Sequence, residues 1–234
     1  MATKHSLQRL SSPSRGVSPA VHILGLGSFI YSYKWLVEHP NPINQAYGWH
    51  FQYLTIIGLT LSTTTFILGI LADISLSRAL FTAKNVMTLT AAPLEVLISL
   101  LYWGLRAIDP ALVVPPELEL PWPADLSFHL APTVFLLLDI LLLSPPWSIR
   151  ALPSLGLSSA IAIAYWLWIE LCFSHNGFYP YPLFALLHFS HRVLLFASCA
   201  VAMAGLTSAL KTVYALVNGV DIPAERPVKL QRRK

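Results

Sequence analysis

Two side chains in apolar segments of this chain could carry out acyl transfer together. Thr55 lies in the segment 51–72, and His129 lies in the segment 126–143. A threonine hydroxyl is a weak nucleophile and attacks a carbonyl carbon only when a base takes its proton. Histidine, with an ordinary pKa of about 6.5, can be that base and can later protonate a leaving alcohol. A fold that brings the two side chains together would supply a nucleophile and a base for ester hydrolysis.

The segments that must position these residues are membrane spans. Hydrophobic residues make up 55% of the 234-residue chain and charged residues only 11%, against about 25% charged in a soluble domain. A span needs about 20 mostly apolar residues. Six segments meet that rule, and together they predict an all-α polytopic membrane protein, a bundle of six transmembrane helices: 18–35, 51–72, 85–105, 126–143, 155–173 and 183–216.

The distribution of basic residues predicts the orientation of the bundle. Lys and Arg resist translocation, so the segments rich in them stay in the cytoplasm. The connections 36–50, 107–125 and 174–182 contain neither residue, which places them outside and both termini inside. We therefore expect a flexible cytoplasmic tail at 1–17, a transmembrane domain at 18–216 and a basic cytoplasmic tail at 217–234. Thr55 and His129 then lie at similar depth, near the outer surface.

Further polar residues gather on the same outer side. His188, His191 and Arg192 share a helical face by their spacing, and the preceding connection and its ends carry Asn176 and Tyr181. These residues are candidates for substrate binding, and Arg192 could hold a free carboxylate because its planar fork matches that group. The alternatives are a hydrogen-bond network, an interfacial cluster, or an ion pair between Arg192 and Glu170 that serves stability alone.

Other polar residues have simpler interpretations. A threonine within a membrane helix usually donates to its own i−4 carbonyl, and we expect this of Thr63, Thr64 and Thr65. Glu95 and Asp139 could tie helices together or belong to an ion path. Asp139 follows His129 by about 15 Å of helix, and no other acid is an obvious partner for His129, so the sequence predicts a dyad without an orienting carboxylate.

The sequence predicts no metal site and no cofactor. Cys172 and Cys199 both lie in apolar segments and lack the spacing of metal ligands. The net charge of +4 and the basic termini suggest contact with anionic lipid and not with nucleic acid, because no nucleic-acid-reading motif is present. Protein partners cannot be named.

Three segments of the chain resemble the androgen-induced family of six-span membrane proteins. They are AYGWHFQYLTIIG, FHLAPTVFLLLD and YWLWIELCFSHNGFYPYPLF. Characterised animal members hydrolyse fatty acid esters of hydroxy fatty acids with a threonine in a YGxxWK[FY]LT-like motif and a histidine at the start of the fourth span. The resemblance implies Thr55 and His129 as the catalytic pair and Asp139 as the acid ten residues later. The closing G-x-x-x-Y-P pattern is met by Gly177, Tyr181 and Pro182.

The function that we expect is intramembrane hydrolysis of a lipid ester with long acyl chains. The resemblance implies that the protein is located in the membrane of the endoplasmic reticulum, and the plasma membrane is the alternative. Three other classes stay open on the sequence: a non-catalytic membrane scaffold, a small-solute transporter that uses Glu95, Asp139 and Glu170, and a haem-binding electron carrier that uses the span-embedded histidines.

Overall fold

The chain folds into a bundle of helices. The computed structural model describes residues 5–219, and every regular element in that range is helical, which confirms the predicted all-α class. The long and short α-helices are α1 (Val17–Glu38), α2 (Leu54–Ser75), α3 (Arg78–Ile108), α4 (Trp122–His129), α5 (Ala131–Leu138), α6 (Ala151–Asn176), α7 (Pro182–Leu186) and α8 (Phe189–Asn218). A π-helix, η5 (Asp139–Leu143), continues α5, and four short 3₁₀ turns lie in the connections: η1 (Pro42–Gln45), η2 (Trp49–Gln52), η3 (Pro110–Leu112) and η4 (Pro116–Leu118).

Four of these helices are long and apolar enough to cross a membrane, namely α2, α3, α6 and α8. A fifth span results if α4 and the α5–η5 segment, which bend by 44° at a short break, are counted as one. Helix α1 forms as expected but is not among the four. The count of six and the cytoplasmic placement of the termini therefore stay predictions. Residues 1–4 and most of the predicted basic tail, 220–234, lie outside the described residues.

The fourth predicted segment is broken where we expected a continuous helix. Pro132 lacks the N–H that would donate to the carbonyl of Phe128, and its ring crowds that carbonyl. The backbone leaves helical geometry at Leu130, with φ −130° and ψ −45°. His129 was expected in the first turn of a span, but it is the last residue of α4 instead. The last predicted segment is also divided, because α7 and α8 are separate helices.

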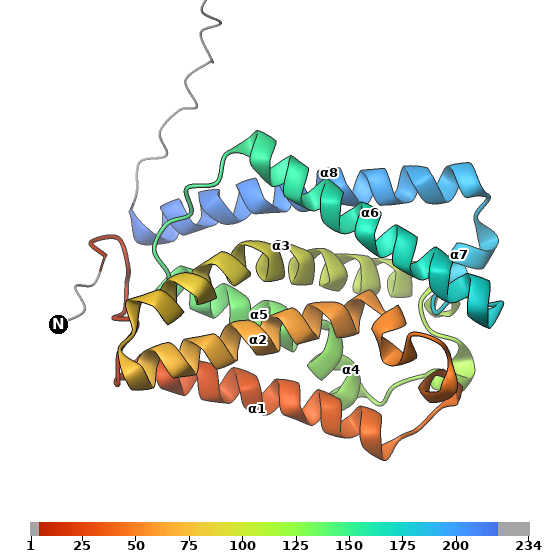
Figure 1. Cartoon of the computed structure of the whole chain (residues 1–234), viewed down its shortest axis with the longest axis horizontal. Coiled ribbons are helices and arrows are strands. Elements are labelled where there is room, and N and C mark those ends of the chain that lie inside the picture. Colours follow the sequence, from red (N-terminus) through yellow and green to blue (C-terminus); the bar gives the residue numbers. More distant parts are fainter. Residues whose placement is uncertain (1–4, 220–234) are drawn as a thin grey trace, which may run out of the picture.

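The helices form two packed groups around α3 (Figure 1). Helices α1, α2 and α5 share a core that includes Phe29, Phe66 and Leu136. Helices α6, α7 and α8 pack through Tyr165, Phe184 and Phe196. Figure 1 also shows that the α1–α2 connection, the α3–α4 connection and α7 meet at one end of the bundle. This end is the one that we predict to lie outside, and it is called the outer end below.

A buried cluster of charged residues ties the opposite end together. The imidazole of His22 lies between two carboxylates, with Nδ1 at 2.8 Å from Asp73 and Nε2 at 3.2 Å from Asp139. The Lys84 ammonium donates to both oxygens of Asp139, at 2.7 and 2.8 Å. Lys84 and Asp139 are both 0% exposed. Because such charges are stable in apolar surroundings only when paired, the cluster holds α1, α2, α3 and η5 in register.

Part of the predicted N-terminal tail is packed on this same end. The amide of Leu10 donates to the carbonyl of Leu142 at 2.8 Å. The side-chain amide of Gln8 donates to the carbonyls of Ser12 and Leu143. Ser18 at the start of α1 joins the arrangement: its hydroxyl lies 2.8 Å from that of Ser12 and donates to Asp73 at 2.9 Å. The segment 8–18 is thus hydrogen-bonded to η5 and to Asp73 at the end of α2.

Candidate active site

Thr55 lies in the first turn of α2, at the outer end of the bundle. Four other threonines of this helix donate to their own i−4 carbonyls at 2.7 to 2.8 Å: Thr60, Thr63, Thr64 and Thr65. This confirms the expectation for Thr63, Thr64 and Thr65. Thr55 differs because its i−4 residue, Phe51, precedes the helix, and the carbonyl of Phe51 accepts instead from the indole of Trp168 at 2.9 Å. The Thr55 hydroxyl therefore lacks the hydrogen bond to an i−4 carbonyl that the other threonines of the helix make.

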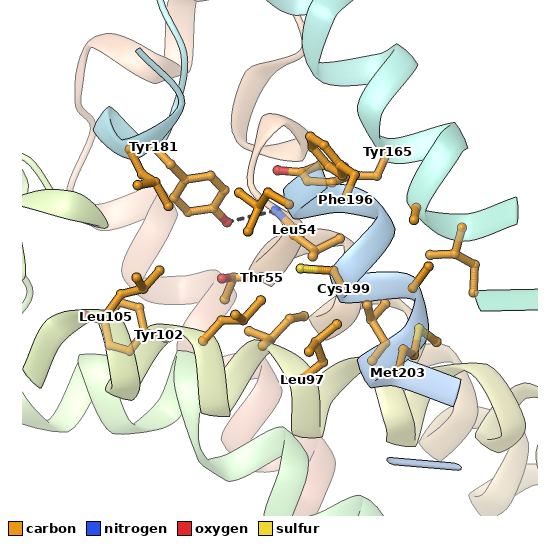
Figure 2. Close-up of a pocket in the computed structure, with 18 of the residues that line it drawn as sticks. Leu54, Thr55, Leu97, Tyr102, Leu105, Tyr165, Tyr181, Phe196, Cys199 and Met203 are labelled. Carbon is orange, nitrogen blue, oxygen red and sulfur yellow. Dashed lines mark hydrogen bonds between the residues drawn. The ribbon is translucent and has the colours of Figure 1, made fainter. Parts of the chain in front are cut away.

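A cavity opens beside Thr55, between α2, α3, α6, α7 and α8. We call it the acyl cavity, because its lining is almost entirely hydrocarbon. On α3 it extends from Leu94 to Leu105, about 17 Å of helix, which is close to one leaflet of a hydrocarbon core about 30 Å thick. Figure 2 shows the Thr55 hydroxyl at the edge of this space, with Leu97 and Met203 farther along it.

A second cavity lies on the other side of Thr55. It is bounded by the outer ends of α1 and α2, by the last two residues of α4 and by the proline-rich connection 109–121, and we call it the outer cavity. Its lining includes the polar side chains of Asn41, His50 and His129. Four residues line both cavities: Thr55, Tyr102, Val113 and Tyr181. Thr55 thus lies where an apolar space meets a more polar one.

His129 is held in one orientation by an acid on its own helix. Its Nδ1 lies 2.8 Å from Oδ1 of Asp125, one turn earlier in α4. The His129 ring stacks on the ring of Tyr102, with centroids 3.4 Å apart and planes 5° apart. Because Nδ1 faces a carboxylate, we assign the ring proton to Nδ1, which leaves Nε2 as the proton acceptor. His129 is 7% exposed and lines the outer cavity together with Thr55.

The carboxylate of Asp125 is itself fixed from α3. The Tyr102 hydroxyl donates to its Oδ1 at 2.6 Å. The guanidinium of Arg106 lies 3.8 Å from the other oxygen and pairs with Glu119 at 2.9 Å. Asp125 is 0% exposed. A buried carboxylate beside an imidazole has the arrangement that stabilises an imidazolium in hydrolases.

The expectation that no acid partners His129 was wrong, and the reason is a helix boundary. We placed the start of the fourth span at residue 126, which left Asp125 in a loop. Helix α4 begins at Trp122, so Asp125 and His129 lie four residues apart on one helical face. The i, i+4 spacing of an acid and a histidine was the signal that could have found this pair. Asp139, the acid implied by the resemblance, is engaged instead by Lys84 and His22.

Tyr181 reaches the site from the connection before α7. Its hydroxyl accepts from the backbone amide of Leu54 at 3.0 Å, as Figure 2 shows. Burial raises the pKa of the Tyr181 phenol, although hydrogen bonds from the Thr55 side chain and from the amides of Leu54 and Thr55 act in the opposite direction. The phenol therefore stays protonated, and a phenol that accepts from an amide still carries one O–H donor.

His50 is a site residue that the sequence reasoning did not include. Its Nε2 lies 3.2 Å from the side-chain oxygen of Asn44, and its ring lines the outer cavity. Burial lowers the pKa of His50, which favours the neutral ring at physiological pH. Only its position inside the segment AYGWHFQYLTIIG marks it in the sequence.

The remaining candidates for substrate binding lie outside both cavities. Arg192 donates to Glu170 at 3.2 Å and to the carbonyl of Leu187 at 2.9 Å. His188 and His191 are exposed, with ring centroids 6.1 Å apart. Asn176 bonds to the backbone of Tyr47 at 2.8 and 3.0 Å. The predicted carboxylate site at Arg192 stays a prediction, and its guanidinium has the Glu170 pairing that we considered as the alternative.

Glu95 and Cys172 line neither cavity, and Cys199 contributes only to the wall of the acyl cavity. Glu95 is buried in α3 and accepts from Ser62 at 3.2 Å, which ties α3 to α2. The two cysteines are free thiols, Cys172 buried and Cys199 on the wall of the acyl cavity. Within residues 5–219, no three His, Cys, Asp or Glu side chains are grouped in a way that could hold a metal ion.

The fold and its several long apolar helices define a polytopic membrane protein. Residues 17–215 match the model of the FAR-17a/AIG1-like protein family, and the chain belongs to this family. It is also 35% identical over 213 residues to a UPF0641 membrane protein of Schizosaccharomyces pombe, an alignment that covers 89% of this chain and 96% of the yeast protein. No solved structure matches the chain. The family is the one that the three sequence motifs indicated.

Proposed function

We propose that the protein is an intramembrane hydrolase of lipid esters, with Thr55 as nucleophile and His129 as base. The observation that carries the proposal is the position of Thr55 at the junction of the two cavities, with His129 on the wall of one of them. An ester carbonyl at this junction would have an apolar space on one side and a proton acceptor on the other. Membership of the FAR-17a/AIG1-like family is consistent with an enzyme.

The chemistry proceeds in two balanced steps. In the first, Thr55 Oγ1 bonds to the carbonyl carbon while its proton passes to Nε2 of His129, and the proton then moves to the departing alkoxide as the C–O bond breaks. In the second, water attacks the acyl-threonine, its proton passes to His129, and the Thr55 oxygen recovers a proton as the acid leaves. Asp125 stabilises the imidazolium that exists between the transfers.

Tyr181 is the candidate for stabilising the negative charge on the carbonyl oxygen. Its hydroxyl lies next to Leu54 and Thr55 and keeps a proton to donate. One fixed donor of this kind contributes about 100- to 1,000-fold to turnover in other hydrolases. The proposed substrates are fatty acid esters of hydroxy fatty acids, which have two long chains joined at one ester. The two cavities support a substrate of that form.

Mutation of the pair tests the proposal. In purified protein reconstituted in vesicles, Thr55→Ala and His129→Ala should each nearly abolish hydrolysis of a long-chain ester, and the double variant should be little worse than either, because residues that act as a unit are not additive. Thr55→Ser keeps the hydroxyl and should retain partial activity. Thr60→Ala, in the same helix but bonded to a backbone carbonyl, is the matched control. Full turnover by Thr55→Ala would exclude Thr55 as the nucleophile.

A further inference from the structure

The two cavities at Thr55 differ in chemistry, and only one of them contains the catalytic imidazole. His129 lines the outer cavity and is absent from the lining of the acyl cavity. The acyl cavity is walled by side chains such as Leu97, Cys199 and Met203, and the outer cavity by Asn41 and His50 as well as apolar groups. This difference makes the two sides of a bound ester distinguishable.

From this geometry we infer that the substrate binds in one direction, with its acyl chain in the acyl cavity and its alcohol portion in the outer cavity. The inference rests on the proposed hydrolase function. The leaving oxygen must receive its proton from His129, so it lies on the outer-cavity side of the carbonyl carbon. The acyl chain, bonded to the opposite side of that carbon, is then directed toward α3 and α8.

The two-step reaction imposes the same direction. After the first step the acyl group is bonded to Thr55 and must stay in place while the alcohol departs and water arrives. A chain in the apolar cavity remains favourably buried, because returning its hydrocarbon to water is unfavourable. The departing alcohol empties the cavity that contains His129, and water can then reach the base through the same space. The reverse orientation would keep the acyl chain where the water is needed.

The same assignment names the residues that set specificity. Cys199 faces the acyl cavity in Figure 2 and lies about one turn before Met203 in α8. Val114, in the connection 109–121, lines only the outer cavity. Cys199 should therefore limit the length of the acyl chain, and Val114 should limit the size of the alcohol.

Substitution of these two residues tests the assignment through ratios of kcat/KM. In Cys199→Trp, the preference for a palmitoyl over a butyryl ester of one alcohol should fall roughly 100-fold, a change of the size that pocket shape produces in other enzymes. In Val114→Trp, the preference for a long over a short alcohol of one acyl group should fall instead. Cys199→Ala and Val114→Ala are the size controls. If Cys199→Trp changed the preference for the alcohol and Val114→Trp changed the preference for the acyl chain, the assignment would be wrong.

Photo-cross-linking tests the direction without turnover. The probes are two N-alkyl amides of a long-chain acid, in which the nitrogen replaces the alkoxy oxygen, with a diazirine near the end of either the acyl chain or the alkyl chain. We expect the acyl-side probe to label peptides of α8 near Cys199 and Met203, and the alkyl-side probe to label residues 113–120. Swapped labels, or both labels in one cavity, overturn the direction.

Ester turnover by the same preparation reports separately on the proposed function. If turnover is absent, both proposals fall. Turnover together with swapped labels refutes only the direction.

Discussion

Replacing Asp125 with asparagine removes one charge from a buried pair without changing the shape of the side chain. The amide oxygen of the asparagine could still accept from Nδ1 of His129, which keeps the ring in place, but the negative charge that stabilises the imidazolium is lost. A hydrogen bond to a charged group contributes about 1.5–3 kcal/mol and a neutral one about 0.5–1.5 kcal/mol, so the substitution loses about 1–1.5 kcal/mol. At about 1.4 kcal/mol for each tenfold change in rate, kcat should fall roughly 5- to 10-fold.

The assay is ester turnover by the purified variant, with thermal unfolding measured on the same sample. Asp125→Ala should be worse than Asp125→Asn, because it also removes the acceptor that orients His129. Tyr102→Phe is the control: it deletes the 2.6 Å bond to Asp125 but keeps the aromatic ring that stacks on His129, so its effect on kcat should be smaller. An Asp125→Asn protein that unfolds at the wild-type temperature and keeps kcat within about twofold would refute the positioning role.

Three further changes have distinct expected outcomes. Tyr181→Phe removes the proposed donor to the carbonyl oxygen and should lower kcat about 100-fold with little change in KM, whereas an equal rise in KM would indicate a binding role instead. Arg192→Ala should lower the melting temperature and affect a free-acid substrate and its methyl ester equally if the pairing with Glu170 is its role; a rise in KM for the free acid alone would restore the carboxylate site. Lys84→Met removes the ammonium that donates to both oxygens of the buried Asp139 and should destabilise the fold by about 3–5 kcal/mol in a denaturation experiment; unchanged stability would show that Lys84 does not hold the helices together.

Much of the fold follows from composition and periodicity, because a long apolar segment in lipid has to satisfy its own backbone as a helix. The helical class and the positions of α2, α3 and α6 could be predicted for this reason. Breaks within a span depend on single residues. Pro132 interrupts the fourth segment, and apolar composition alone does not show where the chain resumes its helix.

The site was partly predictable for a related reason. Thr55 and His129 stand out because polar groups in spans are costly, and the resemblance named both. The acid beside His129 was missed because Asp125 was assigned to a loop, although α4 starts three residues before it. The role of Asp139 depends on which helices meet at the far end of the bundle. Its contacts with His22 and Lys84 join residues that are far apart in sequence, a pairing that spacing along the chain does not encode.

Capture of an acylated Thr55 tests the central claim most directly. With a long-chain ester of a good leaving alcohol, the first step outpaces the second and the acyl-enzyme accumulates in a burst. Acid quenching during the burst, digestion and mass spectrometry should find the mass of the acyl group on the peptide that contains Thr55, and the adduct should be absent from His129→Ala. Continued turnover with no adduct, or an acyl group on a different residue, would contradict the account.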